Sequence, residues 1–330
     1  MLSRPGAFLV DLVPALRHLP GWMPGGGARA FAQPFRDELE RMLDMGFDMV
    51  KERMAGGGEI EPCFLASQLE DQQHEDHLLK WAAVSIQVGG SDTTEATIEG
   101  FFLAMMLHPD AQAAARAEID AVVGRDRLPA LGDRADLPYV NALCLEVLRW
   151  HNASPTGVPH SAPADFVYEQ RDGLGPVLIP KGAMVIPNVW KMMHDGERYP
   201  DPMTFRPERF LGAEAQADPR QVVFGYGRRS VPSIRSLMKW LTHTVSICPG
   251  QQLADSMLFL TCAAVLSTLT ISPVLDDDGR PVMLTLGGTT QVVRWVSRRH
   301  PAITSHVELL SAVLSRLIVS FGQGMSGLEL

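Results

Sequence analysis

Apolar residues recur at helical spacing along most of this chain. One such pattern covers residues 28–54 and ends at the three glycines 56–58, so a helix is predicted there. A second and longer pattern covers residues 76–108. Its stretch 78–88 is apolar nearly all round, which is typical of a helix that is buried in the protein.

Shorter patterns complete the expected fold. Further helices are predicted over residues 110–123, 139–150 and 251–268. Runs separated by Pro and Gly predict short strands at 166–168, 177–179 and 184–186. We expect irregular structure over 1–27, a proline-rich meander over 196–223 and a few short strands in the last sixty residues. The chain is therefore expected to be mainly α with a small β subdomain.

Composition places the chain among ordinary globular proteins. It has 330 residues, of which 46% are hydrophobic and 20% are charged, so a disordered chain is not expected. The net charge of -9 argues against a nucleic-acid partner, which favours a basic surface. The longest apolar run, 257–266, is shorter than the roughly 20 residues of a spanning helix, and the first residues do not form a signal peptide.

Four cysteines occur, and none belongs to a C-x-x-C pair. They are Cys63, Cys144, Cys248 and Cys262. This spacing does not match structural zinc or iron–sulfur sites, and four cysteines in so long a chain do not form a disulfide framework. A buried small apolar residue is the default interpretation of each, and only Cys248 has a context that changes it.

The first candidate motif lies inside the long apolar pattern. It reads Gly89-Gly90-Ser91-Asp92-Thr93-Thr94. Two glycines within a helix cost about 1 kcal/mol each relative to alanine, which indicates close approach of a ligand, and an acid beside a hydroxyl can relay protons. Alternatively, Asp92 begins a helix and forms a capping box with Glu95. The sequence leaves both interpretations open.

Two further motifs combine acids with arginines. Glu146 and Arg149 lie three residues apart in the helix predicted over 139–150, a spacing that permits an ion pair. Arg209, in the motif Phe205-Arg206-Pro207-Glu208-Arg209-Phe210, is a candidate third member of the same network. Taken alone, the Glu146 and Arg149 pair is typical of a surface ion pair, and the motif 205–210 is typical of a turn with charged flanks.

The last motif joins a glycine-rich turn to a cysteine. Phe224-Gly225-Tyr226-Gly227-Arg228-Arg229 is followed, after an interval, by Cys248-Pro249-Gly250 at the start of a predicted helix. The positive end of a helix dipole favours the thiolate form of a cysteine. A thiolate is the axial ligand that favours O–O cleavage at iron, and a nearby arginine can bind a carboxylate.

The four motifs, in this order, resemble those of the cytochrome P450 family. Their sequences are most similar to those of fungal microsomal-type enzymes of secondary metabolism. The sequence between the motifs is also similar to the family, as in Leu137-Pro138-Tyr139, Ile179-Pro180-Lys181-Gly182 and Tyr199-Pro200-Asp201-Pro202. The resemblance covers roughly residues 5–275.

The resemblance implies a set of roles around a haem. Cys248 is the implied thiolate ligand of the iron, and Asp92 with Thr93 deliver protons to bound dioxygen. Glu146, Arg149 and Arg209 form the implied structural triad. The residues implied to contact the cofactor are Gly89, Gly90, His160, Phe224, Gly227 and Arg229, of which Arg229 and His160 pair with propionates. The loop 153–158 is implied to line the substrate pocket.

The resemblance also implies the function of the family. We expect a monooxygenase that inserts one atom of dioxygen into an apolar organic substrate, with electrons from NADPH through a separate reductase. The full-length relative is expected at the endoplasmic reticulum membrane. Residues 1–330 are expected to form a single, partial P450 domain that lacks the early part of the family pattern.

Three departures from the pattern leave alternatives. Eighteen residues separate Arg229 from Cys248 where the family has one, so 230–246 are expected to be an insertion, either a retained intron or a real loop. The tail 283–330 matches poorly, and Asn152 stands where proline is common. A catalytically inactive remnant that does not bind haem stably, or an α-helical interaction protein without a cofactor, are the alternatives.

Overall fold

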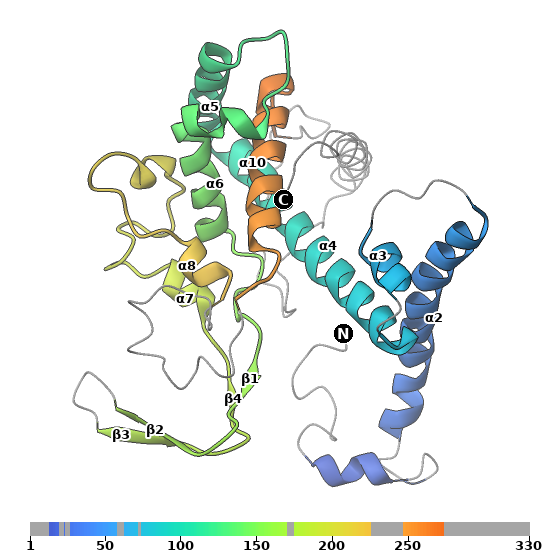
Figure 1. The fold of residues 1–330 in the computed structure, drawn as a ribbon. Coiled ribbons are helices and arrows are strands. Elements are labelled where there is room, and N and C mark those ends of the chain that lie inside the picture. The colour runs from blue at the N-terminus through green and yellow to red at the C-terminus, as the bar shows by residue number, and fades with distance from the viewer. Residues whose placement is uncertain are drawn as a thin grey trace, which may run out of the picture. The chain divides into compact units, whose positions relative to one another are not determined.

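The computed structural model describes residues 13–19, 23, 27–57, 63–71, 74–169, 175–225 and 247–273 (Figure 1). The earlier elements, with η for a 3-10 helix, are η1 (Pro14–His18), α2 (Gly27–Ala55), α3 (Phe64–Asp71), α4 (Asp76–Leu107), α5 (Pro109–Val122), η2 (Leu131–Asp136) and α6 (Pro138–Trp150). The later elements are β1 (His160–Ser161), β2 (Phe166–Glu169), β3 (Pro176–Ile179), β4 (Met184–Val185), α7 (Val189–Met193), η3 (Pro207–Phe210), α8 (Arg220–Val223) and α10 (Gln251–Thr268). This content confirms the expected mainly α fold.

The long helices begin and end within one residue of the sequence prediction. Proline occupies the first position of both α5 and α6, where its missing N–H would have had no helical partner. Helices α3 and α7 were not predicted from the sequence, because eight and five residues are too few to display a helical period. The meander expected over 196–223 contains η3 and α8.

The chain divides into two compact units, with the division between Glu95 and Ala96 inside α4. In the first unit, α2 and α3 pack with the earlier part of α4 around a small core. Its buried members are Phe47, Val50, Leu65, Ala66 and Leu79. Lys51 and Lys80 place their ammonium groups 4.7 and 5.0 Å from the centre of the Phe47 ring and also pair with Asp76 and Asp44.

The expectation that the stretch 78–88 is buried is wrong for most of its side chains in this structure. Leu79 and Val84 are buried, but Leu78, Trp81 and Ile86 are exposed by 56%, 39% and 60%. Helices α2 and α3 contribute the core around Leu79, so this part of α4 packs through one side. A helix that is apolar all round buries only the faces against which another element packs.

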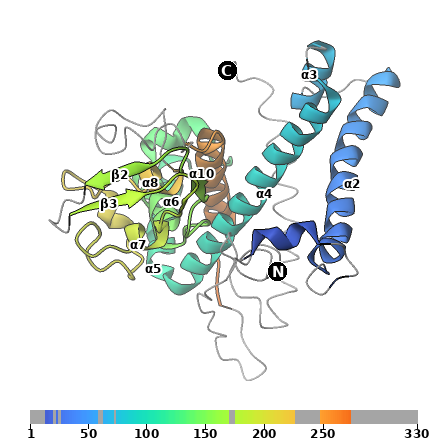
Figure 2. The ribbon, with the colours of Figure 1, turned by 90° about the horizontal axis from the view of Figure 1, so that it is seen from below.

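The second unit has the larger core. The later part of α4 packs with α5, α6 and α10, and the last three lie side by side in both views (Figures 1 and 2). The fully buried members include Phe101, Leu103, Ala115, Ile119, Leu143, Val147, Phe259 and Cys262. Burying each large apolar side chain contributes about 1.5–3 kcal/mol, so this cluster fixes the helices that carry the candidate motifs.

Two small antiparallel sheets belong to the same unit. Strand β1 pairs with β4, with His160 opposite Val185, and β2 pairs with β3, with Phe166 opposite Ile179. The β2–β3 hairpin is seen in Figure 2. These strands agree with the runs predicted from the sequence, except that β1 was not predicted.

Several expectations fall on residues that the structure does not describe. They concern the insertion 230–246, the tail 283–330 and strands in the last sixty residues. That residues 1–330 form a single domain stays a prediction. Among the helices that the structure describes, none combines the length and apolarity that crossing a membrane requires.

Candidate functional site

Glu146 and Arg149 form a buried ion pair on α6. They lie three residues apart, so both point from the same side of the helix. Arg149 donates from Nε to Glu146 Oε2 at 2.7 Å and from Nη2 to Oε1 at 2.8 Å. Both side chains are 0% exposed, so this pair is not the surface feature that the motif alone permitted.

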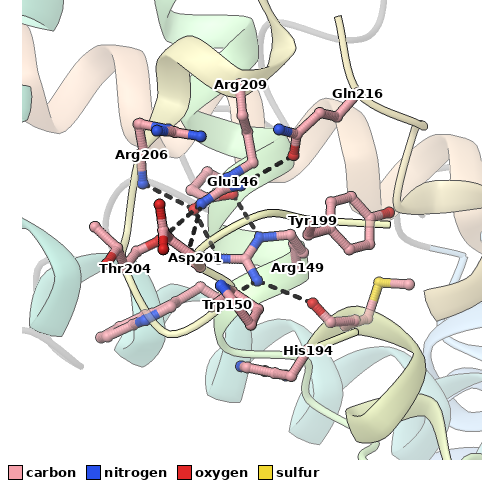
Figure 3. A network of polar contacts seen from close by, with 12 residues as sticks. Glu146, Arg149, Trp150, His194, Tyr199, Asp201, Thr204, Arg206, Arg209 and Gln216 are labelled. Atoms are coloured by element: carbon pink, nitrogen blue, oxygen red, sulfur yellow. Dashed lines mark hydrogen bonds and ion pairs between the residues drawn. The ribbon is translucent and has the colours of Figure 1, made fainter. Parts of the chain in front are cut away.

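Arg209 of η3 joins the same carboxylate (Figure 3). Its Nε lies 3.1 Å from Glu146 Oε1, and the backbone N–H of Arg206 donates to the same oxygen at 2.8 Å. The structure therefore brings Glu146, Arg149 and Arg209 together, although Arg209 comes sixty-three residues after Glu146.

The other guanidinium N–H groups bind backbone carbonyls, and Arg209 Nη1 also donates to Gln216 Oε1 at 2.9 Å. Arg149 donates to Met193 and Pro202 at 2.9 and 2.7 Å, and Arg209 donates to Pro200 and Thr204 at 3.0 Å each. Burial lowers the pKa of the Arg209 guanidinium, and the charge of Glu146 opposes this shift. Two cations with one anion thus fasten the meander around 193–209 onto α6, since buried charges require such partners.

The turn before α10 holds the candidate ligand Cys248. The backbone N–H of Cys248 donates to the carbonyl of Phe224 at 2.8 Å, and the N–H of Gln251 donates to the carbonyl of Cys248 at 3.3 Å. Phe224 packs against the main core, and Gly225 adopts a φ of 81°, which favours glycine. The Cys248 side chain is partly exposed, whereas Cys144 and Cys262 are buried.

Gly250 leaves room beside this sulfur. A Cβ added there would lie 3.9 Å from Cys248 Sγ, which is an ordinary contact distance. Helix α10 begins at the next residue, so the cysteine turn lies at the N-terminus of this helix.

The structure brings the two ends of the long interval together. Phe224 and Cys248 are hydrogen-bonded although twenty-three residues, 225–247, separate them. The interval therefore does not prevent the cysteine from meeting the turn that precedes it. Gly227 and Arg229 lie outside the described residues.

The motif from Gly89 to Thr94 lies within α4, which runs without a break from Asp76 to Leu107. The interpretation of Asp92 as a helix start is therefore wrong. Ser91 Oγ donates to the carbonyl of Gln87 at 2.7 Å, and Thr93 Oγ1 donates to that of Gly89 at 2.8 Å. A Cβ added to Gly89 or Gly90 would meet no atom within 4 Å in the described part of the chain.

His160 lies on β1, where it is half-buried. Its Nδ1 lies 2.7 Å from the carbonyl oxygen of Val158, in the loop implied to line a substrate pocket. The structure thus places His160 beside that loop. Its pairing with a propionate stays a prediction.

A second ion cluster was missed by the sequence reasoning. Asp255 of α10 binds Arg134 at 2.7 Å and Arg220 at 3.3 Å. These three residues come from distant stretches and match no short motif, so no pattern in the sequence indicated that they meet. They meet because α10 packs against η2 and because Arg220 of α8 reaches Asp255.

Comparisons with known proteins bear on the family of the chain. The profile of the family described as Cytochrome P450 matches residues 5–232. Cytochrome P450 monooxygenase 208 of Postia placenta is 45% identical over 280 residues, which are 83% of this chain and 50% of that protein. Tryptamine 4-monooxygenase of Psilocybe cyanescens is 33% identical, over 88% of this chain and 55% of that protein.

Solved structures give the same result. A zebra fish cytochrome P450 with abiraterone superposes with a TM-score of 0.58 at 29% identity, over 76% of this chain and 56% of that one. The chain spans about half the length of these relatives. Family profile, relatives and fold all agree, and the chain belongs to the cytochrome P450 family.

Proposed function

We propose that this chain is the haem-binding part of a haem-thiolate monooxygenase. One atom of dioxygen enters a C–H bond of an apolar organic substrate, and the other leaves as water with two electrons and two protons. The observation that carries the proposal is the position of Cys248 at the start of α10, with its N–H bonded to the Phe224 carbonyl.

The residues of the candidate site fit a bound haem whose iron is ligated by a cysteine. Cys248 supplies a partly exposed sulfur at a helix start, which is the donor that thiolate-ligated iron takes. Haem, when bound, supplies the activation of dioxygen. The N–H donation to the Phe224 carbonyl and the start of α10 fix the backbone of Cys248. Arg229 and His160 are the proposed partners of the propionates.

Asp92 and Thr93 are the proposed proton carriers. They follow each other on α4, so their side chains lie about 100° apart around the helix. The Thr93 hydroxyl donates its proton to the Gly89 carbonyl at 2.8 Å. Asp92 is exposed and can exchange protons with solvent. Gly89 and Gly90 are proposed to leave space for the cofactor beside the helix.

The Glu146–Arg149–Arg209 network is the proposed structural support of the cysteine side of the fold. It joins α6 to η3, and α6 packs against α10, whose first turn follows Cys248. The network therefore acts on the site through packing.

Electrons are proposed to come from NADPH through a separate reductase, and the whole protein is proposed to act at the endoplasmic reticulum membrane. Support comes from the fungal relatives, which are named monooxygenases. Because the chain spans about half of those relatives, substrate, partner and location are proposals about the whole protein.

A second candidate function is a P450 chain that does not hold haem. The eighteen residues between Arg229 and Cys248 favour it, because the family joins the propionate partner to the ligand through one residue. Sequencing the transcript across these residues separates a retained intron from a real loop.

Haem titration tests the proposal. The purified chain is reduced and exposed to carbon monoxide, and we expect the difference spectrum of thiolate-ligated haem. Cys248→Ser should abolish this signature because serine offers no thiolate. Cys63→Ser, which changes an exposed cysteine, should retain it. A wild-type chain without the thiolate signature would overturn the proposal in favour of the second candidate.

A further inference from the structure

Asp255 connects three separate stretches of chain around the start of α10. It lies seven residues after Cys248, and its side chain is 13% exposed. Arg134 Nη1 lies 2.7 Å from its Oδ2, and Arg220 Nη1 lies 3.3 Å from both of its oxygens. A carboxylate shared by two partly buried guanidinium groups is strongly held.

Arg134 attaches Asp255 to the core side of the unit. Its Nε donates to Asn141 Oδ1 on α6 at 2.7 Å. Its guanidinium carbon lies 5.1 Å from the centre of the Phe259 ring, which follows Asp255 by one turn of α10. Arg134 therefore binds α10 at two successive turns and α6 at one point, which fixes the lateral position of α10.

Arg220 attaches Asp255 to the chain that precedes the cysteine turn. It lies on α8, four residues before Phe224, and its Nη2 binds Asp218 at 2.7 Å. The Arg220–Asp255 pair thus links the chain before Gly225 to the chain after Ile247.

The Phe224–Cys248 hydrogen bond is the second link between the same two stretches. Both links join residues that lie before 226 to residues that lie after 246. Neither link is made by a residue of 226–246.

We propose that Asp255 is a positioning residue for Cys248. By binding Arg220 and Arg134, it keeps the first turn of α10 against α8 and η2. The Cys248 N–H consequently stays on the Phe224 carbonyl whatever the length of the interval. The role of this positioning in catalysis rests on the proposed haem-thiolate function. The contacts themselves are made by the protein without haem.

Hydrogen exchange at the Cys248 amide tests the proposal on the full chain without haem. Asp255→Asn keeps the shape of the side chain and removes its charge. We expect exchange at Cys248 to become about tenfold faster, the factor that corresponds to about 1.4 kcal/mol in local opening. The amide of Cys262, in the interior of α10, serves as the reference for global unfolding.

Two variants complete the experiment. Arg220→Gln removes the pairs of Arg220 with Asp255 and with Asp218 but leaves the Arg134–Asp255 pair intact. It should accelerate exchange at Cys248 in the same direction, which covers the case that Asp255→Asn does not fold. Asp120→Asn is the control, because Asp120 is 34% exposed and pairs with Arg125 at 2.8 Å outside η2, α8 and α10. It should leave the ratio of Cys248 to Cys262 exchange unchanged.

Unchanged exchange at Cys248 in both Asp255→Asn and Arg220→Gln would overturn the proposal. So would equal acceleration at Cys248 and Cys262, because that result indicates general destabilisation. A wild-type chain that shows no thiolate signature with haem overturns the proposed function instead, and the exchange ratios still decide the role of Asp255.

Discussion

Glu146 is a buried carboxylate that pairs with two buried arginine side chains. Its carboxylate accepts from Arg149, Arg209 and the backbone of Arg206, and its side chain is 0% exposed. Replacing such a carboxylate leaves two guanidinium groups in the interior without their anion.

Glu146→Ala is therefore expected to lower the free energy of unfolding by about 3–5 kcal/mol, as measured by urea denaturation. Glu40→Ala is the control, because its pair with Arg36 is exposed and should contribute under about 1 kcal/mol. A loss for Glu146→Ala as small as that of the control would contradict a structural role for the network.

His108 links pH to stability at the scale of a single ring. It stacks on Phe205 with ring centres 5.1 Å apart and meets Trp150 edge-on at 6.0 Å. Burial lowers the pKa of His108 below its ordinary value of 6.5, although the charge of Glu146 opposes the shift. The unfolded chain then binds the proton more readily than the folded protein.

Stability from His108 is consequently complete above about pH 6.5 and is lost as the pH falls through the lower folded pKa. His108→Phe keeps an aromatic ring that does not titrate. We expect wild type to lose more stability than this variant between about pH 7.5 and pH 5 in urea denaturation. Equal losses in the two proteins would show that His108 does not contribute.

Among whole elements, the contact of α4 with the end of α6 depends on one glycine. A Cβ on Gly100 would lie 2.5–2.9 Å from three atoms of His151, which is fully buried. No real Cβ tolerates such distances to a ring held in the core, so α4 approaches α6 this closely only with glycine.

Gly100→Ala should destabilise the protein by about 1–3 kcal/mol despite the higher helix propensity of alanine. Gly90→Ala, in the same helix, meets no described atom within 4 Å and should instead stabilise the apo-protein by about 1 kcal/mol. Chemical denaturation of both variants checks the opposite signs. A stabilising Gly100→Ala would mean that His151 moves at little cost.

The interval between Phe224 and Cys248 is a second feature at the scale of whole elements. Removal of 230–246 would leave six residues between Phe224 and Cys248, whose backbones already form a hydrogen bond. We expect this deletion to raise the free energy of unfolding by about 1 kcal/mol through the smaller loop-closure entropy.

The deletion variant should also keep the slow exchange of the Cys248 amide, measured as above. Faster exchange at that amide would mean that the interval itself holds the turn. A scrambled sequence of the same length in place of 230–246 is the matched control for loop length.

For the molecule as a whole, cofactor binding and stability are linked. A ligand that binds only the folded protein stabilises it by about 2.7 kcal/mol at a hundredfold excess over its dissociation constant. Haem should therefore raise the thermal unfolding midpoint of wild type and of Cys63→Ser more than that of Cys248→Ala. Equal increases in all three proteins would indicate adsorption of haem without ligation by Cys248.

Sequence patterns sufficed for the positions of the long helices and for the family. The period of α4, α5 and α10 is a local property, and proline marks the first residue of α5 and α6. The family profile matches residues 5–232, which include the motif around Glu146, and the relatives belong to the same family.

Burial was predicted less well, because it depends on what packs against an element. The stretch 78–88 is apolar all round, yet Ile86 is exposed in the structure. Glu146 and Arg149 have the spacing of a surface pair, yet both are buried because Arg209 and backbone carbonyls of the meander surround them.

The sequence by itself determined the family, the mainly α content and the identity of the candidate ligand Cys248, because these depend on local period and on motif order. Only the tertiary structure decided that Asp92 lies inside α4, that Phe224 meets Cys248 across the interval, and that Asp255 joins Arg134 to Arg220. The reason is physical: contacts between residues far apart in sequence depend on the packing of several elements at once, and no single stretch of the chain encodes them.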